Sequence, residues 1–354
     1  CPVPPRSLTR THGCAGSTAE SGVAGPAPEV AATRVAVRRA LAATGLTGRR
    51  VLVACSGGAD SLALAAATAF VVPRDGGTAG AVVVDHGLQA HSAQVAEAAA
   101  AQCRDLRLGP VEVVRVTVTS TGEGPESAAR EHRLAALTDA AERLGAAGVL
   151  LGHTRDDQAE QVLLGLARGS GARSLAGIPP VRPARAGSAV RLVRPFLALP
   201  RATTEGSCRE LGLQPWSDPH NTDEGFARVR ARRVLPVLER ELGPGITAAL
   251  ARTADLLRDD ADALDDAARA AYAQLGEPPW PVRGLATLSP AVRRRVWREL
   301  ALRAGSPSGA LTAEHLRAVD ALVTNWRGQG PIDLPGGLRV HRRGDLITPL
   351  PTTA

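Results

Sequence analysis

Four short apolar runs, each followed by a segment with helical character, organise the first half of this 354-residue chain. We expect these runs to be strands that begin near Val51, Ala81, Val111 and Val149. The segments expected as helices cover residues 60–70, 91–108, 125–144 and 155–168. Strands that are apolar throughout are typical of a parallel sheet with helices on both faces. The sequence therefore predicts an α/β fold, with a parallel sheet sandwiched by helices.

The same alternation predicts where a ligand binds. In open parallel sheets, ligands bind beyond the carboxyl ends of the strands. Ser56, Asp85 and His153 each follow one of the expected strands closely. We expect these three residues to converge on one site.

The rest of the chain divides by composition. Residues 1–28 are rich in Pro, Gly, Ser and Thr without apolar periodicity, and we expect a disordered extension there. Residues 29–235 are assigned to the α/β domain. Residues 236–330 have helical spacing, and residues 331–354 hold short strand-like runs between Gly-rich turns. A smaller, mainly helical domain with a tail of short strands is therefore expected after the α/β domain.

The basic residues are unusual, because all 42 are arginines and the chain has no lysine. This excludes a Walker-type phosphate loop, a pyridoxal enzyme and a protein kinase, each of which needs a lysine. GC-rich coding explains such a composition, and so does the recognition of phosphates and bases by guanidinium groups. The most basic stretch, residues 181–235, holds ten arginines against five acidic residues. It is either a surface that faces nucleic acid or a solvated loop.

The cysteines and the apolar runs indicate the cellular compartment of the protein. The five cysteines form no C-x-x-C pair, which favours free thiols in a reducing compartment over a zinc or iron–sulfur site. The longest apolar run, Leu62 to Val72, is shorter than the roughly 18 residues of a membrane span. A cytoplasmic protein without membrane contact is expected. Six aspartates within residues 255–266 have the spacing of a solvated helix face rather than of a metal cluster.

The strongest chemical signal is the hexapeptide Ser56, Gly57, Gly58, Ala59, Asp60 and Ser61, directly after a buried strand and at the start of a helix. Two glycines let the backbone approach a phosphate, and the N–H groups of the helix start supply donors. Asp60 would repel a phosphate unless a cation such as Mg²⁺ lay between them. We therefore predict a nucleotide-binding loop with Asp60 as metal ligand. An ordinary Gly-rich turn is the alternative.

Two further groups are candidates for nucleotide contacts. Asp85 and His86 end the second strand, where a ribose or a substrate is expected, although a lone histidine is usually structural. Arg130 and Arg133 lie three residues apart on one helix face. Both can reach a triphosphate, or they form ion pairs on a solvated helix.

A third group combines His153, Asp157 and Glu160, whose spacings of four and three residues place them on one face of a helix start. Two carboxylates at the mouth of a phosphate site can hold a metal ion or a cationic substrate. The alternative is that they only cap the helix.

The hexapeptide resembles the pyrophosphate loop of the PP-loop enzymes, or N-type ATP pyrophosphatases, which have an adenine nucleotide hydrolase-like fold. All four groups in this order resemble the tRNA(Ile)-lysidine synthetase family. Further segments that resemble this family are Leu163–Gly171, Arg194–Leu197 and Asp218–Asp223, the last continuing to Arg230. The resemblance covers about residues 48–240. His220 and Val229 depart from it, because Ser and Asn are common at these positions.

The resemblance implies an ATP-dependent carbon–nitrogen ligase that acts on isoleucine tRNA with a CAU anticodon. The C2 carbonyl of the wobble cytidine would attack the α-phosphate of ATP and release pyrophosphate. The side-chain amine of free L-lysine would then displace AMP to give lysidine, which changes the codon read from AUG to AUA.

The resemblance also implies roles for the candidate residues. The Ser56–Ser61 loop would hold pyrophosphate and Asp60 would recruit Mg²⁺. Asp157 and Glu160 would attract the lysine ammonium, and Arg130 or Arg133 would neutralise phosphate charge. Residues 181–235 and the helical domain would bind the tRNA backbone.

Other functions remain as alternatives. A tRNA thiolase activates the same kind of carbonyl, but such enzymes commonly carry paired cysteines. Amidotransferase chemistry needs a glutaminase domain, for which the chain has no spare length. A non-catalytic nucleotide-binding module would have lost Asp60, Asp157 or Glu160, and all three are present. The sequence allows a homodimer without indicating one.

Overall fold

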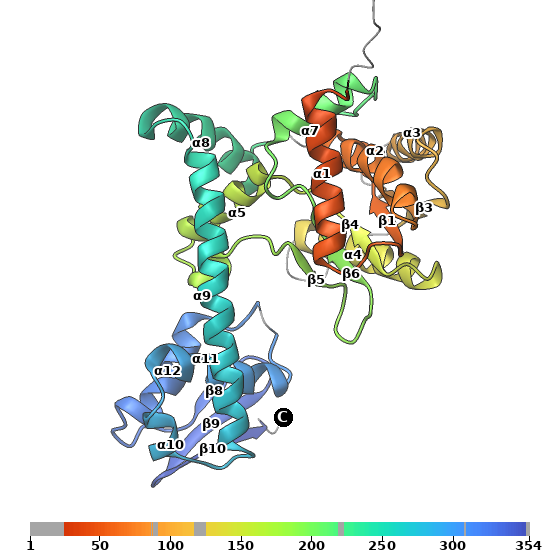
Figure 1. Cartoon of the computed structure of the whole chain (residues 1–354). Coiled ribbons are helices and arrows are strands. Elements are labelled where there is room, and N and C mark those ends of the chain that lie inside the picture. Colours follow the sequence, from red (N-terminus) through yellow and green to blue (C-terminus); the bar gives the residue numbers. More distant parts are fainter. Residues whose placement is uncertain are drawn as a thin grey trace, which may run out of the picture.

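The computed structural model describes residues 25–85, 87, 91–116, 125–218, 223–307 and 309–351, with the backbone alone for 125–130. Figure 1 shows two bodies connected by the long helix α9 (Ile246–Leu275). Among the described residues, no helix is both long and apolar enough to cross a membrane. Most of the extension expected over residues 1–28 lies outside the described residues, and helix α1 (Pro28–Ala43) includes its last residue.

The first body is built on a six-stranded sheet with the order β3-β2-β1-β4-β6-β5. Its strands are β1 (Arg50–Ala54), β2 (Thr78–Asp85), β3 (Val111–Arg115), β4 (Gly148–Leu150), β5 (Val181–Pro183) and β6 (Arg191–Val193). All neighbouring pairs are parallel except β5 with β6. The predicted parallel sheet is therefore confirmed. The sequence did not reveal β5 and β6, which are three residues long and lie in the Arg-rich stretch.

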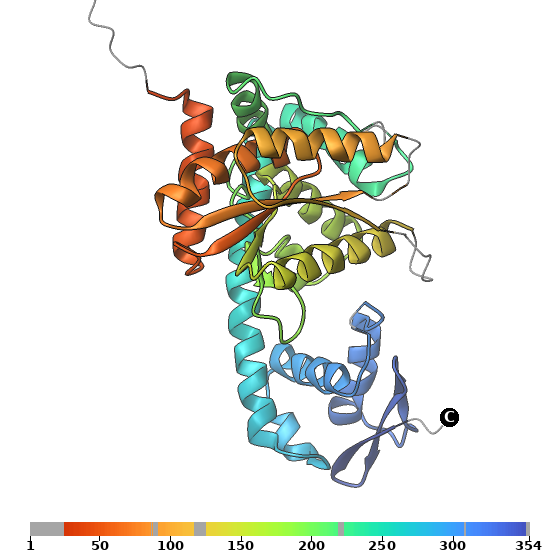
Figure 2. The same ribbon diagram turned by 90° about the vertical axis from the view of Figure 1, so that its right-hand side faces the viewer.

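Both faces of this sheet are buried, as the apolar strands predicted. Val51 and Val53 of β1 belong to the cluster that includes residues of α1, α2 and α3, whereas Leu52 between them packs with α4. Successive strand residues point to opposite faces, so an apolar run can fill two cores. Figure 2 shows α3 and α4 on opposite sides of the sheet. The helices of this body are α1, α2 (Ala59–Arg74), α3 (Ser92–Asp105), α4 (Pro125–Arg143), α5 (Arg155–Ala167), α6 (Ala172–Leu175), α7 (Arg201–Glu210) and α8 (Ala227–Leu242).

The second body is smaller and combines helices with a four-stranded antiparallel sheet of order β7-β10-β9-β8. Its elements are β7 (Trp280–Pro281), α10 (Val282–Ala286), α11 (Pro290–Arg303), α12 (Ala313–Thr324), β8 (Ile332–Leu334), β9 (Leu338–Arg343) and β10 (Leu346–Pro351). The three expected short strands are present. They share one core with Trp280, Trp297 and the helices, so they are an integral part of this body.

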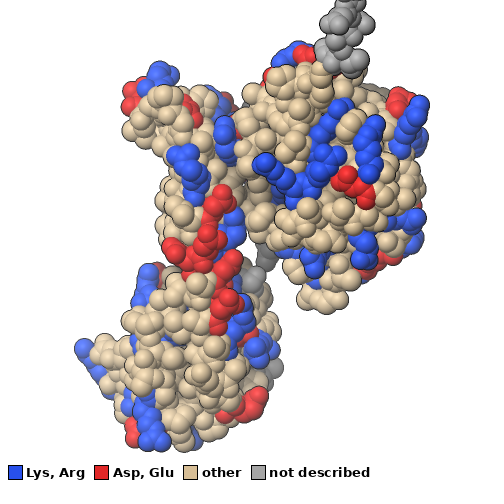
Figure 3. Space-filling view, in the orientation of Figure 1, with Lys and Arg blue, Asp and Glu red and all other residues tan. Residues whose placement is uncertain are grey.

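Four aspartates of α9, at positions 255, 262, 265 and 266, form ion pairs with arginines. Asp262 and Asp265 both pair with Arg173 of α6, and Asp265 also accepts from Arg295 of α11 at 2.7 Å. Figure 3 shows acidic side chains gathered along α9 between the two bodies. The acidic face therefore connects elements of both bodies through ion pairs.

A buried polar network lies in the core of the second body. The Arg293 guanidinium donates to the Asp320 carboxylate at 2.6 and 3.2 Å and to the Leu288 carbonyl at 2.8 Å. Trp297 Nε1 donates to the same carboxylate at 3.1 Å. Arg293 is 4% and Asp320 7% exposed, so neither charge has water as an alternative partner.

We therefore predict that Asp320→Ala destabilises the second body by about 3–5 kcal/mol, because it leaves a buried guanidinium without its counter-ion. Urea unfolding followed by tryptophan fluorescence measures this, since Trp280 and Trp297 lie in that core. Asp333→Ala is the matched control, because it breaks the exposed pair of Asp333 with Arg339. Equal unfolding midpoints for both variants would contradict the stabilising role of the network.

Candidate active site

The Ser56–Ser61 loop connects β1 to α2 and is held in shape by its own hydrogen bonds. Ser61 Oγ accepts from the Ser56 backbone N–H at 3.1 Å and donates to the Gly58 carbonyl at 2.9 Å. Gly57 has a φ of +82°, and a Cβ there would lie 3.2 Å from that of Ala99. The loop is thus preformed, with the N-terminus of α2 directly behind it. This geometry suits an anion, because the first N–H groups of a helix lack partners within that helix.

A cavity of about 970 Å³ opens at this loop. It contains residues that follow three strands, so Ser56, Asp85 and His153 converge as predicted. Among the predicted site residues, those that line the cavity are Ser56, Gly58, Ala59, Asp60, Ser61, Asp85, Arg133, His153 and Asp157. Gly57 and Glu160 lie outside its lining. His86 and the side chain of Arg130 lie outside the described part of the chain.

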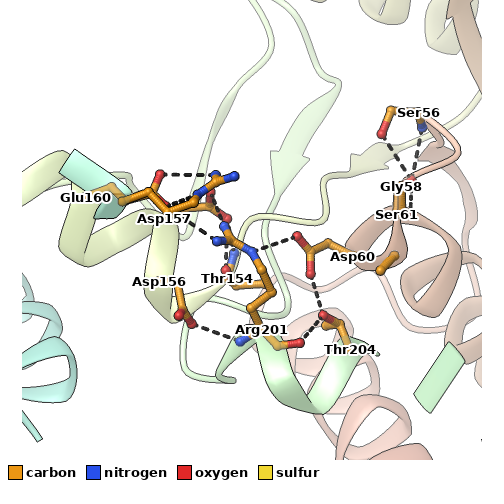
Figure 4. Close-up of polar contacts among 12 residues, drawn as sticks. Ser56, Gly58, Asp60, Ser61, Thr154, Asp156, Asp157, Glu160, Arg201 and Thr204 are labelled. Carbon is orange, nitrogen blue, oxygen red and sulfur yellow. Dashed lines mark hydrogen bonds and ion pairs between the residues drawn. The ribbon is translucent and has the colours of Figure 1, made fainter. Parts of the chain in front are cut away.

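The central contact of the site is Arg201, at the start of α7. Its guanidinium lies 3.0 Å from Asp157 Oδ1, 3.4 Å from Glu160 Oε1 and 3.5 Å from Asp60 Oδ2. Figure 4 shows Arg201 between Asp60 on one side and Asp157 and Glu160 of α5 on the other. Its backbone N–H also donates to Asp156 at 2.8 Å. Burial works against the charged guanidinium, but the carboxylates, Asp157 foremost, outweigh it and raise the pKa of Arg201.

Asp157 and Glu160 have different surroundings, although both lie on α5. Asp157 Oδ2 accepts from Thr154 N–H at 2.7 Å and from Thr154 Oγ1 at 2.9 Å, so this carboxylate also caps the helix. Burial favours the neutral acid, but Arg201 and the Thr154 hydrogen bonds dominate and lower the pKa of Asp157. Glu160 is fully buried and also accepts from Arg232 Nε at 2.8 Å. Of these two residues, only Asp157 lines the cavity.

Asp60 also lines the cavity, and its side chain is 26% exposed. Burial, reinforced by the charge of Asp157, raises its pKa against the opposing effects of Thr204 and Arg201. No group of three or more His, Cys, Asp or Glu side chains among the described residues is placed to hold a metal ion. Mg²⁺ is commonly held by one or two carboxylates together with substrate phosphates. Asp60 beside the phosphate-type loop fits that arrangement.

His153 and Asp85 also line the cavity. Burial, together with the charges of Arg194, Arg133 and Arg228, lowers the pKa of His153 to about 3 despite the nearby Asp157. Asp85 is 4% exposed, and its Oδ1 accepts from the Gly87 backbone N–H at 3.0 Å. His153 is thus a neutral imidazole at physiological pH, and Asp85 fixes the turn after β2.

The described part of the Arg-rich stretch contains helices and strands, so it is not a loop throughout. It forms β5, β6, α7 and the start of α8. Arg194 is 3% exposed and donates to the Pro179 carbonyl at 2.7 Å, and Arg230 donates to the Gly225 carbonyl at 2.9 Å. Arg185 pairs with Asp139 at 2.9 Å. Several of these arginines therefore hold the fold itself together.

Comparison with known proteins agrees with this geometry. Residues 32–238 match the family model of the PP-loop domain, and residues 281–347 match that of the TilS substrate binding domain. The tRNA(Ile)-lysidine synthase of Thermobifida fusca is 58% identical over 328 residues, which cover 92% of this chain and 98% of that protein. The chain belongs to the tRNA(Ile)-lysidine synthase family. The Salinispora arenicola member is 56% identical, with 91% of this chain and 96% of that protein covered.

The fold also occurs in a solved structure outside this family. The U34-tRNA thiolase NcsA from Methanococcus maripaludis, determined with its [4Fe-4S] cluster, matches with a TM-score of 0.55 at 20% identity. The match covers 65% of this chain and 80% of the thiolase. It shows a shared PP-loop fold, whereas the family relationship favours the lysidine synthases over the thiolase alternative.

The depressed pKa of His153 is directly testable. We predict that its imidazole stays neutral, so that its NMR C2–H resonance shows no titration step between about pH 8 and about pH 5. A group whose folded pKa is lowered gains its proton only below this window. His153→Asn removes the resonance and so assigns it. A titration step near the ordinary histidine pKa would contradict the buried, arginine-lined environment.

Proposed function

We propose that this protein ligates L-lysine to C2 of the wobble cytidine of isoleucine tRNA with a CAU anticodon, with cleavage of ATP to AMP and pyrophosphate. The observation that carries the proposal is the cavity itself. A preformed phosphate-type loop lines the same cavity as the carboxylates of Asp60 and Asp157. A reaction that joins a nucleotide-activated base to a cationic amino acid uses both features. The protein would act on this tRNA in the cytoplasm.

The first step uses the loop side of the cavity. The backbone N–H groups at the start of α2 and the Ser56 hydroxyl would hold the pyrophosphate portion of ATP. The cytidine O2 attacks the α-phosphorus, and the bond to pyrophosphate breaks. Arg133, which lines the cavity, would balance negative charge on the phosphates. Mg²⁺ held by Asp60 would supply further charge neutralisation.

The second step uses the carboxylate side. Asp157 would attract the cationic lysine, while Glu160 contributes only indirectly, because it is buried and occupied by Arg201 and Arg232. The neutral side-chain amine attacks C2, the bond between C2 and the AMP oxygen breaks, and the amine proton is released.

The second body is proposed to bind the tRNA, together with α9. The match of residues 281–347 to a substrate binding domain supports this proposal. The division proposed between residues 235 and 236 falls inside α8, which continues to Leu242. Helices α8 and α9 would therefore connect the body proposed to bind ATP with the body proposed to bind tRNA.

We predict that Asp60→Asn lowers the rate of pyrophosphate release by about 10²–10³-fold, because the variant loses the negative charge proposed to hold a cation beside the phosphates. Pyrophosphate release with tRNA and ATP is the measurement. Asp75→Asn is the matched control, since Asp75 lies at the far end of α2 and pairs with Arg38. Pyrophosphate release at the normal rate by Asp60→Asn would overturn the assignment of Asp60 as a metal ligand.

For Asp157→Asn, we predict that the KM for lysine rises about 10- to 150-fold while the KM for ATP changes little, because a charge-assisted contact to the substrate is lost. Steady-state kinetics with each substrate varied in turn measures both constants. Thr154→Ala is the matched control, because it removes one capping hydrogen bond of Asp157 and leaves the carboxylate charge in place. A rise in the KM for ATP alone would instead place Asp157 in the nucleotide site.

A further inference from the structure

Trp216 is the only Trp, Tyr or Phe residue among those that line the active-site cavity. The chain has few such residues, with four Trp, one Tyr and three Phe. Trp280 and Trp297 are fully buried in the second body. Trp216 is partly exposed, so a flat apolar surface is available at a polar cavity. The proposed mechanism gives Trp216 no role.

Backbone hydrogen bonds at three positions hold the segment that carries Trp216. Gln102 of α3 holds both backbone groups of Gln214, accepting from its N–H at 3.0 Å and donating to its carbonyl at 3.1 Å. The Trp216 N–H donates to the Gly57 carbonyl at 2.9 Å. Leu213 N–H donates to the Cys208 carbonyl at 3.0 Å. A backbone held in this way loses little conformational freedom when a ligand binds beside it.

The same hydrogen bond places Trp216 against the phosphate-type loop. A Cβ built at Gly57 would lie 4.0 Å from the Trp216 Cβ. A nucleotide whose phosphates occupy the loop, or a base that reacts there, therefore comes within reach of this residue. Arg209 of α7 lines the cavity as well and adds positive charge to it.

We infer that Trp216 is a stacking platform for a nucleobase in this cavity. The inference rests on the proposed function, which brings two nucleobases to the site, the adenine of ATP and the wobble cytosine of the tRNA. Stacking on an aromatic face suits either base, because every base presents a π-face. The ring determines how well the base is held, while the loop and the carboxylates carry the chemistry.

Intrinsic fluorescence tests whether the ring contacts a base. The full chain is titrated with ATP alone and, separately, with an anticodon stem-loop RNA that carries the wobble cytidine. We expect at least one of these ligands to quench the emission of the wild type and of Trp326→Phe, but not of Trp216→Phe. Trp326 lies in the second body beneath Arg342 and serves as the matched control. Quenching by ATP identifies adenine as the stacked base, and quenching by the RNA alone identifies cytosine.

Substitutions then separate stacking from simple packing. Trp216→Leu keeps an apolar side chain without a π-face, and we expect it to weaken binding of the quenching ligand by about 5- to 150-fold. Trp216→Phe keeps the π-face and is expected to stay within about threefold of the wild type. Equal binding by the Leu and Phe variants, or no quenching by either ligand, overturns the inference. If the wild type forms no lysidine but its quenching persists, the proposed function fails while the stacking role stands.

Discussion

The site depends on one guanidinium that lets three carboxylates share a small volume. Asp60 comes from α2, and Asp157 and Glu160 come from α5, and all three face Arg201 of α7. Without this cation, the mutual repulsion of the carboxylates would drive protonation or displacement of at least one of them. Arg201 also ties α7 to α5 through its backbone N–H. The phosphate-type loop and the acidic side of the cavity are therefore held in a fixed relation before any substrate binds, which is the condition for electrostatic catalysis.

The sheet explains why these helices meet at all. Both faces of β1 and β2 are buried. Because these strands and β4 are parallel, their carboxyl ends lie at the same edge of the sheet. Gly152, just beyond β4, is so close to α2 that a Cβ there would lie 3.0 Å from the Asp60 carbonyl. A larger residue would push the Asp60 turn away from α5. The apolar core thus sets the spacing of the charged site.

The sequence predicted the elements whose signal is local. The strand–helix alternation, the glycine loop and the convergence of Ser56, Asp85 and His153 follow from periodicity and from the rule that ligands bind at strand ends. The spacing of Asp157 and Glu160 indicated a shared helix face, but it contained no sign that Arg232 of α8 covers Glu160. The roles assigned to the predicted site residues remain predictions.

Arg201 was missed for a physical reason. Its partners on α5 lie 41 to 45 residues away in the chain and Asp60 lies further still, so no local spacing records these contacts. Helix α7 begins after Pro200 in a polar stretch with few apolar residues, and its neighbours β5 and β6 are too short to show alternation. Trp216 was missed similarly, because its closeness to Gly57 exists only in the folded chain. Pro200, directly before the first residue of α7, was the one available sign of a helix start.

The central claim is that one cavity activates a tRNA base with ATP and then joins lysine to it. Mass analysis of isoleucine tRNA with a CAU anticodon, incubated with the protein and ATP in the presence and absence of lysine, tests it most directly. The account predicts that the wobble cytidine gains one lysine, with loss of water, only when ATP and lysine are both present. It also predicts that pyrophosphate is released in step with the modification. An unmodified cytidine under these conditions, or a modification that does not depend on lysine, would contradict it.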